Sequence, residues 1–282
     1  MKFINKTLNQ VQGRGLVDTF LNSRWDNVAR RYSNIDYSTE PNHPFKLSLR
    51  NPLRQLLLRE QNSYCCYCMR LINANSTTFE HVVAKSRSTI TQTTLDQYSN
   101  YPIIRNSVCL QSIFDNARVK LNTPPYPLEI AYENLTASCN GKFLPDGVSV
   151  QTCNCKRQDN FILPLFYIST IQSEIVYRNG GLIESLNNSY DASINTLRLN
   201  HNTLQKVRQV WYHISVENIG NIENADTELK RNVILTTNLI SLPSTRRNQL
   251  IGDFKTETFW NVLLQYKWFY DYYKRTYPIV NR

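Results

Sequence analysis

The sequence predicts an α+β chain that is mainly helical. Apolar residues recur at helical intervals near both ends, whereas residues 64–161 lose regular periodicity and hold all seven cysteines. A chain of 282 residues that is 41% hydrophobic can form one large or two modest domains with a substantial core. This composition excludes a wholly disordered polymer and a small disulfide-stapled protein.

The charge balance points weakly to an anionic partner. Lysine and arginine total 32 against 22 acidic residues, a formal charge of +10, but the charges are scattered along the chain. No stretch approaches the roughly 18 consecutive apolar residues of a membrane span. The first residues alternate apolar and polar side chains, which is unlike a signal peptide. We therefore expect a cytoplasmic protein with reduced thiols and no membrane partner.

Residues 1–62 are expected to form an N-terminal helical segment. After a short arm, one apolar stripe at helical spacing comprises Leu21, Trp25, Val28 and Tyr32. Asn51 and Pro52 have the pattern of an N-cap followed by proline at the first helical position. The second helix should then end near residue 62.

Residues 171–282 are expected to form a β-hairpin followed by helices. Apolar runs on either side of a glycine turn predict the hairpin over residues 174–184. A helical stripe follows at Leu204, Val207, Trp211 and Ile214. Further helices are expected over about 223–240 and about 253–275. The last is rich in aromatic residues, which are either buried within their own domain or docked on a partner protein.

The cysteines suggest a metal rather than disulfides, because their number is odd and the expected compartment is reducing. Cys65 and Cys68 form a C-x2-C pair, whose spacing lets one tight turn present two thiolates to zinc. Cys139 and Cys153 would supply the second pair, with Cys155 as an alternative to Cys153. Four thiolate ligands leave no open position, so such a zinc would be structural.

The two cysteines outside this set, Cys66 and Cys109, are expected to be ordinary buried thiols. The histidines His43, His201 and His213 are expected to be structural or surface residues.

An acidic residue directly precedes a histidine at Glu80-His81, between the cysteine groups. The carboxylate can coordinate a hard cation while the imidazole accepts a proton from water. Further along come Asn134-Leu135, with Cys139 shortly after, and then Cys153-Asn154-Cys155 followed by basic residues. Taken alone, the Glu-His pair is a weak signal, but this order of motifs is far more restrictive.

That order resembles the HNH, or ββα-metal, endonuclease family in its form with a four-cysteine zinc. The MKFINK start (residues 1–6), Gln61 before the C-x2-C pair and the segment 195–200 are similar to one branch. This branch contains the HNH subunit of the Septu anti-phage system and retron-associated relatives. The resemblance implies an HNH core over residues 63–170, inserted in a mainly helical chain and carrying a long insertion at 87–130.

The resemblance also implies roles for individual residues. His81 matches the general base, and Asn134 the residue that orients the histidine loop. Glu80 and Asn154 match ligands of a catalytic Mg²⁺ or Mn²⁺ ion, which would stabilise charge on the phosphate. The basic residues expected to hold flanking phosphates are Lys85, Lys156 and Arg157.

The expected function is therefore metal-dependent hydrolysis of DNA, in a bacterial anti-phage system regulated by a partner ATPase of the ABC or SMC type. The sequence has no G-x4-G-K-[ST] loop, so ATP dependence would come from that partner. One alternative is a zinc-stabilised module that binds nucleic acid or protein and has a degenerate nuclease site. Another is an HNH nuclease that acts on RNA.

Overall fold

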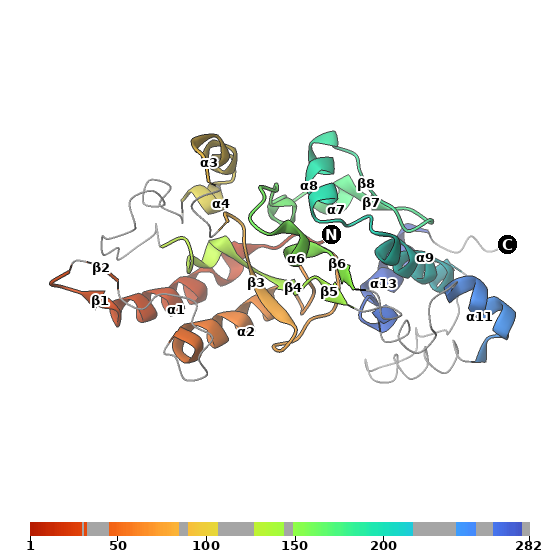
Figure 1. Cartoon of the computed structure of the whole chain (residues 1–282), viewed down its shortest axis with the longest axis horizontal. Helices are drawn as coiled ribbons and strands as arrows, with labels where there is room; N and C mark the ends of the chain where they lie inside the picture. Colours follow the sequence, from red (N-terminus) through yellow and green to blue (C-terminus); the bar gives the residue numbers. More distant parts are fainter. Residues whose placement is uncertain are drawn as a thin grey trace. The chain divides into compact units, whose positions relative to one another are not determined.

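The structure is a computed structural model. It describes the residue ranges 1–29, 31–32, 45–84, 90–106, 127–143, 149–216, 241–251 and 262–277. The helix expected over 223–240 and the residues His43, Lys85 and Cys109 lie outside these ranges. Within them the chain combines helices with small antiparallel two-stranded sheets, which confirms the α+β class (Figure 1).

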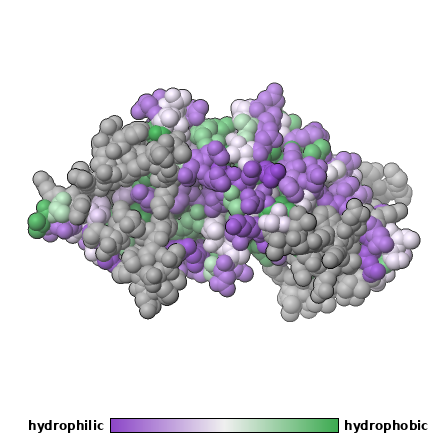
Figure 2. Space-filling model, in the orientation of Figure 1, coloured by the Kyte–Doolittle hydropathy of each residue, from purple (hydrophilic) through white to green (hydrophobic). Residues whose placement is uncertain are grey.

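The described chain divides into two compact units. The first unit comprises Met1–Tyr67, Ile72–Asn140 and Arg157–Gln172. The second unit comprises Cys68–Leu71, Gly141–Lys156 and Ser173–Arg282. In the described ranges, no helix is both long and apolar enough to cross a bilayer. Hydrophilic residues cover most of the described surface on the face that Figure 2 shows.

The first unit combines helices with two antiparallel two-stranded sheets. In chain order, the helical elements are η1 (Lys6–Asn9), α1 (Gln10–Asn22), the π-helical turn η2 (Phe45–Arg50), α2 (Asn51–Glu60), α3 (Gln92–Ser99), α4 (Pro102–Arg105), η4 (Tyr132–Asn134) and η6 (Leu165–Tyr167). The strands are β1 (Trp25–Asp26), β2 (Arg31–Tyr32), β3 (Thr77–His81) and β4 (Leu135–Cys139). They pair as β1–β2 and β3–β4.

The first helix is shorter than its apolar stripe predicts. Helix α1 ends at Asn22, and the chain then forms the β1–β2 hairpin, in which Trp25 pairs with Tyr32. Their rings meet edge to face at 5.1 Å. The Asp26 carboxylate accepts hydrogen bonds from the amides of Val28 and Ala29, which closes the turn. Val28 is 95% exposed, so its place in a buried helical stripe was wrong.

Helix α2 buries the expected leucine face, including Leu53, Leu56 and Leu57. Its start differs from the prediction, because the π-helical turn η2 leads directly into it. Arg50, rather than Asn51, is the residue at the N-cap position, and its backbone is already helical.

A buried polar network fixes η4, the turn that enters β4. The ammonium group of Lys6 lies 2.5 Å from a carboxylate oxygen of Glu60, and the Tyr132 hydroxyl donates to the other oxygen at 2.5 Å. Arg14 of α1 pairs with Glu133 at 2.6 Å. Since buried charges are costly unless paired, this network holds the turn in one arrangement.

The second unit contains two hairpins and several helices. Its strands are β5 (Lys142–Phe143), β6 (Val150–Gln151), β7 (Ile175–Tyr177) and β8 (Ile183–Ser185). Its helical elements are η7 (Asn188–Tyr190), α8 (Asp191–Thr196), α9 (Asn202–Val216), α11 (Ser244–Ile251) and α13 (Trp268–Thr276). The short helices α6 (Cys153–Arg157) and α7 (Ile171–Glu174) each include residues of both units.

The hairpin of β7 and β8 and the apolar stripe of α9 confirm the predictions for this region. Val176 pairs with Glu184, and the α9 residues expected to be apolar and inward are all buried.

The final aromatic helix is interrupted within its described part, where a turn over residues 265–267 precedes α13. Two carbonyls there have partners outside the helix. The Gln265 carbonyl accepts from the Leu71 amide at 2.6 Å, and the Leu263 carbonyl accepts from the Trp211 indole at 3.0 Å. These bonds replace helical ones, which explains why the prediction of one continuous helix was wrong.

Candidate metal centre and candidate active site

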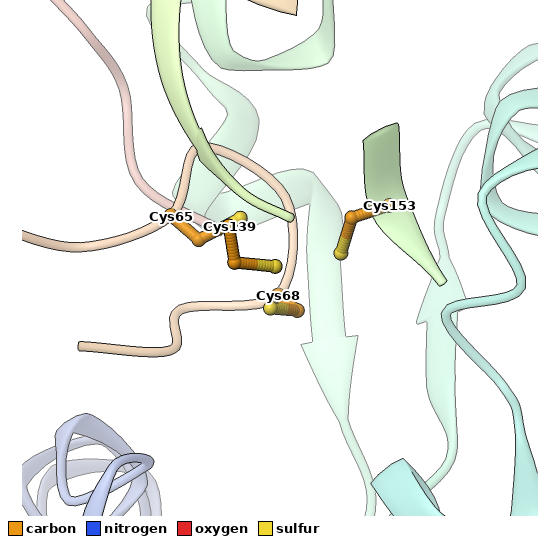
Figure 3. Close-up of side chains that lie close together, drawn as sticks. All are labelled: Cys65, Cys68, Cys139 and Cys153. Atoms are coloured by element: carbon orange, nitrogen blue, oxygen red, sulfur yellow. The ribbon is translucent and has the colours of Figure 1, made fainter. Parts of the chain in front are cut away.

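Four buried cysteines come together: Cys65, Cys68, Cys139 and Cys153. Their sulfur atoms all lie within 4.8 Å of one another (Figure 3). A tetrahedral zinc with Zn–S bonds of about 2.3 Å requires sulfurs roughly 3.8 Å apart. The cluster therefore needs only small side-chain adjustments to hold a metal ion such as zinc.

Three separate backbone features supply these sulfurs. Cys65 and Cys68 lie on the turn that follows α2, and Cys139 is the last residue of β4. Cys153 begins α6, where its amide donates to the Leu197 carbonyl at 3.0 Å. Its φ of 50° is in the left-handed region, which is unusual for a residue other than glycine.

Gly141 allows the chain to turn sharply after Cys139. Its φ is 69°, and an added β-carbon would lie 1.9 Å from the Thr152 carbonyl oxygen. The Gly141 carbonyl accepts from the Thr152 amide at 2.8 Å, which closes the β5–β6 hairpin immediately before Cys153. Only glycine fits this position without displacing the backbone.

Gln61 attaches the cysteine turn to β4. Its side-chain amide donates to the Ala137 carbonyl at 2.8 Å and accepts from the Ala137 amide at 2.7 Å. It also donates to the Tyr64 carbonyl, and the Cys66 amide donates to the Ala137 carbonyl at 3.1 Å. These bonds fix the position of Cys65 relative to the end of β4.

Hydroxyl groups lie beside two of the clustered sulfurs. Ser138 Oγ is 3.6 Å from Cys65 Sγ, and Tyr266 Oη is 3.7 Å from Cys68 Sγ. A hydroxyl that donates to a thiolate stabilises its negative charge, so both contacts suit a metal-bound sulfur.

The choice of the fourth sulfur falls on Cys153, since Cys155 is not part of the cluster. Cys66, also outside it, is buried, and burial raises the pKa of its thiol well above the ordinary value. Cys66 therefore stays protonated, as expected for a buried structural thiol. A centre of four cysteines is closed, so a metal held there serves the fold rather than a reaction.

His81 is the last residue of β3 and is half-buried. Its Nε2 lies 3.1 Å from the Glu129 carbonyl oxygen. Because a carbonyl can only accept, this contact places the ring proton on Nε2 and leaves the lone pair of the neutral imidazole on Nδ1. The Nδ1 atom is thus the one that can take a proton.

Asn134 fastens the chain just after His81. Its Oδ1 accepts from the Val83 amide at 2.7 Å, and its Nδ2 donates to the carbonyls of Val83 and Leu128 at 3.2 and 2.9 Å. The Asn134 carbonyl also accepts from the Val82 amide at 2.9 Å. Together with the β3–β4 ladder, in which His81 pairs with Leu135, these bonds fix the backbone at His81.

Arg157, at the end of α6, is buried and contacts β3 instead of solvent. Its Nη1 pairs with the Glu80 carboxylate and also donates to the His81 carbonyl, while Nη2 donates to the Val82 carbonyl at 2.7 Å. Its Nε donates to the Asn160 carbonyl at 3.1 Å. The side chain is only 1% exposed, so the expectation that it contacts a DNA phosphate was wrong.

The Glu80 carboxylate is equally buried, at 2% exposed. Burial raises the pKa of Glu80, and the Arg157 guanidinium opposes this rise. Burial alone would lower the pKa of Arg157, but Glu80 together with Tyr67 and Tyr98 raises it above the ordinary value. The carboxylate expected to bind a catalytic divalent ion therefore already has a positive partner from the protein.

The other predicted site residues lie on or near α6. Asn154 is half-buried on this helix and Lys156 is exposed on it, whereas Lys85 lies outside the described ranges. Lys156 is thus open to an anionic ligand.

Sequence reasoning missed a tyrosine at this site. The Tyr98 hydroxyl of α3 donates to the Val82 carbonyl at 2.6 Å, and its ring meets Phe161 edge to face. Burial raises the pKa of Tyr98 to about 12. Its only sequence signal is a single aromatic residue in the short helix α3, three residues after Leu95.

Comparison of the chain with protein-family models, with curated proteins and with solved structures finds no match.

Proposed function

We propose that the chain is a nuclease of the HNH type that hydrolyses DNA, with His81 as its general base. The observation that carries this proposal is the placement of His81 at the end of an antiparallel pair of strands. Its Nε2 faces the Glu129 carbonyl and its backbone is held by Asn134, so Nδ1 can accept a proton. A neutral imidazole suits removal of a proton from water at neutral pH.

The cysteine cluster supports the same proposal. The resemblance combines a four-cysteine zinc with a Glu-His strand, and here Cys139 lies on the strand that pairs with the Glu80-His81 strand. We propose zinc as the ion, because four cysteine thiolates are its typical structural ligands.

The divalent ion expected at Glu80 and Asn154 does not fit the described arrangement, since Arg157 occupies the Glu80 carboxylate. We therefore assign no step to such an ion. Dependence on Mg²⁺ or Mn²⁺ remains an expectation from the resemblance. The same ion pair favours a second candidate function, a zinc-stabilised binding module in which the nuclease site is degenerate.

Histidine variants separate these candidates. We expect His81→Ala to lower the rate of cleavage of supercoiled plasmid DNA by about 10²-fold or more, as loss of a general base does. Circular dichroism and zinc content should stay unchanged. His213→Ala, a half-buried histidine on α9, is the matched control and should keep full activity.

The same cleavage assay measures which nucleic acid is cut and which divalent ion is required. The wild-type chain is incubated with matched DNA and RNA, with Mg²⁺, with Mn²⁺, and without added divalent ion. Cleavage of RNA alone would favour the ribonuclease alternative. If wild type and His81→Ala show the same very low level of cleavage, the binding module is favoured instead.

We also propose a role in anti-phage defence with a partner ATPase of the ABC or SMC type; this rests on the resemblance alone. Cells that express the chain with and without a neighbouring ATPase gene can be challenged with phage. Fewer plaques only when both are present would support the proposal, and unchanged plaque counts would contradict it.

A further inference from the structure

A polar cavity of about 380 Å³ lies in the second unit, at the segment that joins α8 to α9. The residues that line it are Asn195, Arg198, Asn200, His201 and Asn202. This set includes a cation and several amides but no carboxylate. Its electrostatic character therefore favours an anionic ligand.

The walls of the cavity are held by the backbone. The Asn200 amide side chain bonds both the amide and the carbonyl of Ile183, at 2.8 and 2.9 Å. The Arg198 amide donates to the Asn195 carbonyl, and the His201 amide donates to the Arg198 carbonyl, both at 3.0 Å. The φ of Arg198 is 51°, so a tight left-handed turn presents this side chain. The cavity is thus preformed rather than assembled on binding.

Arg198 supplies the positive charge. Its side chain is exposed, and within the described ranges its guanidinium takes part in no hydrogen bond or ion pair. A guanidinium with all its donors available can bind a phosphate with two parallel hydrogen bonds.

His201 supplies a neutral donor. Its Nδ1 accepts from the Thr203 amide at 3.2 Å, so the proton of the neutral ring is on Nε2. Burial and the nearby Arg198 lower the pKa of His201, which keeps the ring neutral at pH 7. Asn202 begins the 15-residue helix α9, whose positive end adds to the field in the cavity.

The cavity segment is attached to α6. The Leu197 carbonyl accepts a hydrogen bond from the Cys153 amide at 3.0 Å. In the chain, Arg198 directly follows Leu197, and Asn154 directly follows Cys153. Lys156, exposed on α6, adds a second cation close in sequence to this contact. Two cations on connected segments suit successive phosphates of a polymer better than a single small anion.

We propose that this cavity binds a backbone phosphate of a nucleic-acid strand, with Arg198 as the charged contact and His201 as a neutral donor. The inference rests on the proposed function and names a substrate-binding position for it.

The test measures binding separately from cleavage. A full-length His81→Ala chain is titrated against fluorescently labelled DNA duplex and single strand, without added divalent ion, over a range of salt concentrations. We expect Arg198→Ala to weaken binding about tenfold and to reduce the salt dependence by roughly one phosphate contact. Alanine keeps the β-carbon, so the backbone strain at φ 51° stays the same.

Arg275→Ala is the matched control, because Arg275 is an exposed arginine on α13 outside the cavity. It should leave the affinity unchanged, and Arg198→Lys should retain part of the binding. Circular dichroism confirms that all variants fold.

Equal DNA affinities of Arg198→Ala and its parent would overturn the inference. A site that binds only small anions would also overturn it. In that case inorganic phosphate would stabilise the parent against unfolding but not Arg198→Ala, and the two would bind DNA equally well. If the chain never cleaves DNA but needs Arg198 to bind it, the proposed nuclease function is refuted and the proposed phosphate-binding role of the cavity is supported.

Discussion

The cysteine cluster and the Glu80–Arg157 pair are two buried polar sites that balance charge differently. The cluster gathers four thiols, whose deprotonated forms would repel one another without a cation from outside. At the second site, one carboxylate meets a guanidinium from the chain itself. The first site can therefore hold a metal ion, whereas the second is already neutral.

This difference separates the two metal sites expected from the sequence, one from cysteine spacing and one from the family resemblance. Zinc at the cysteines agrees with the geometry of the sulfurs, but a divalent ion at Glu80 requires Arg157 to move away. Experiments that remove one partner from each site test the contrast directly.

The largest effect is expected at the cysteines. Structural zinc supplies about 10–16 kcal/mol of binding free energy in small zinc domains. Cys68→Ser should lower the unfolding free energy by about 5 kcal/mol or more, and metal analysis should fall from one zinc per chain towards none.

Cys155→Ser is the matched control, because this half-buried cysteine lies outside the cluster. It should keep the zinc and the melting temperature of the wild type. A metal-free protein that is as stable as the zinc-loaded one would contradict the structural role.

The next effect is expected at the ion pair. Arg157→Met leaves the Glu80 carboxylate buried without its partner, which should cost about 3–5 kcal/mol in chemical denaturation. The double variant Glu80→Gln/Arg157→Met removes the stranded charge and should recover part of this loss. If Mn²⁺ restores the stability of Arg157→Met but not of the double variant, Glu80 is a metal ligand once Arg157 is absent.

The smallest effect is a pH dependence at Tyr98. Its pKa rises from 10.0 to about 12 on folding, so the stabilisation is complete below pH 10 and is lost as the pH rises through 12. The unfolding free energy of the wild type should therefore fall by about 2–3 kcal/mol relative to Tyr98→Phe over this range. Denaturation at several pH values measures this difference, and parallel curves for the two proteins would contradict it.

Local sequence patterns predicted the structural elements that are determined by residues close together in the chain. The spacing of Cys65 and Cys68 indicated a metal turn, and the two glycines after Tyr177 indicated the β7–β8 hairpin. The apolar stripe of α9 gave its buried face.

Long-range pairing could not be predicted in the same way. Arg157 stands beside Lys156, so the two looked like one exposed basic pair, although one is buried and the other exposed. The partner of Arg157 is Glu80, 77 residues earlier in the chain. Trp25 and Tyr32 have helical spacing, but the Asp26 turn joins them as neighbours in a hairpin.

The backbone of Cys153 has a further consequence for how this position can vary. Its left-handed conformation disfavours any side chain with a β-carbon by roughly 1–2 kcal/mol, so glycine would relax the main chain there. Judged by main-chain strain alone, glycine is therefore the better residue at this position. A glycine there would also remove one of the four clustered sulfurs, so the change that relaxes the main chain takes away a candidate metal ligand.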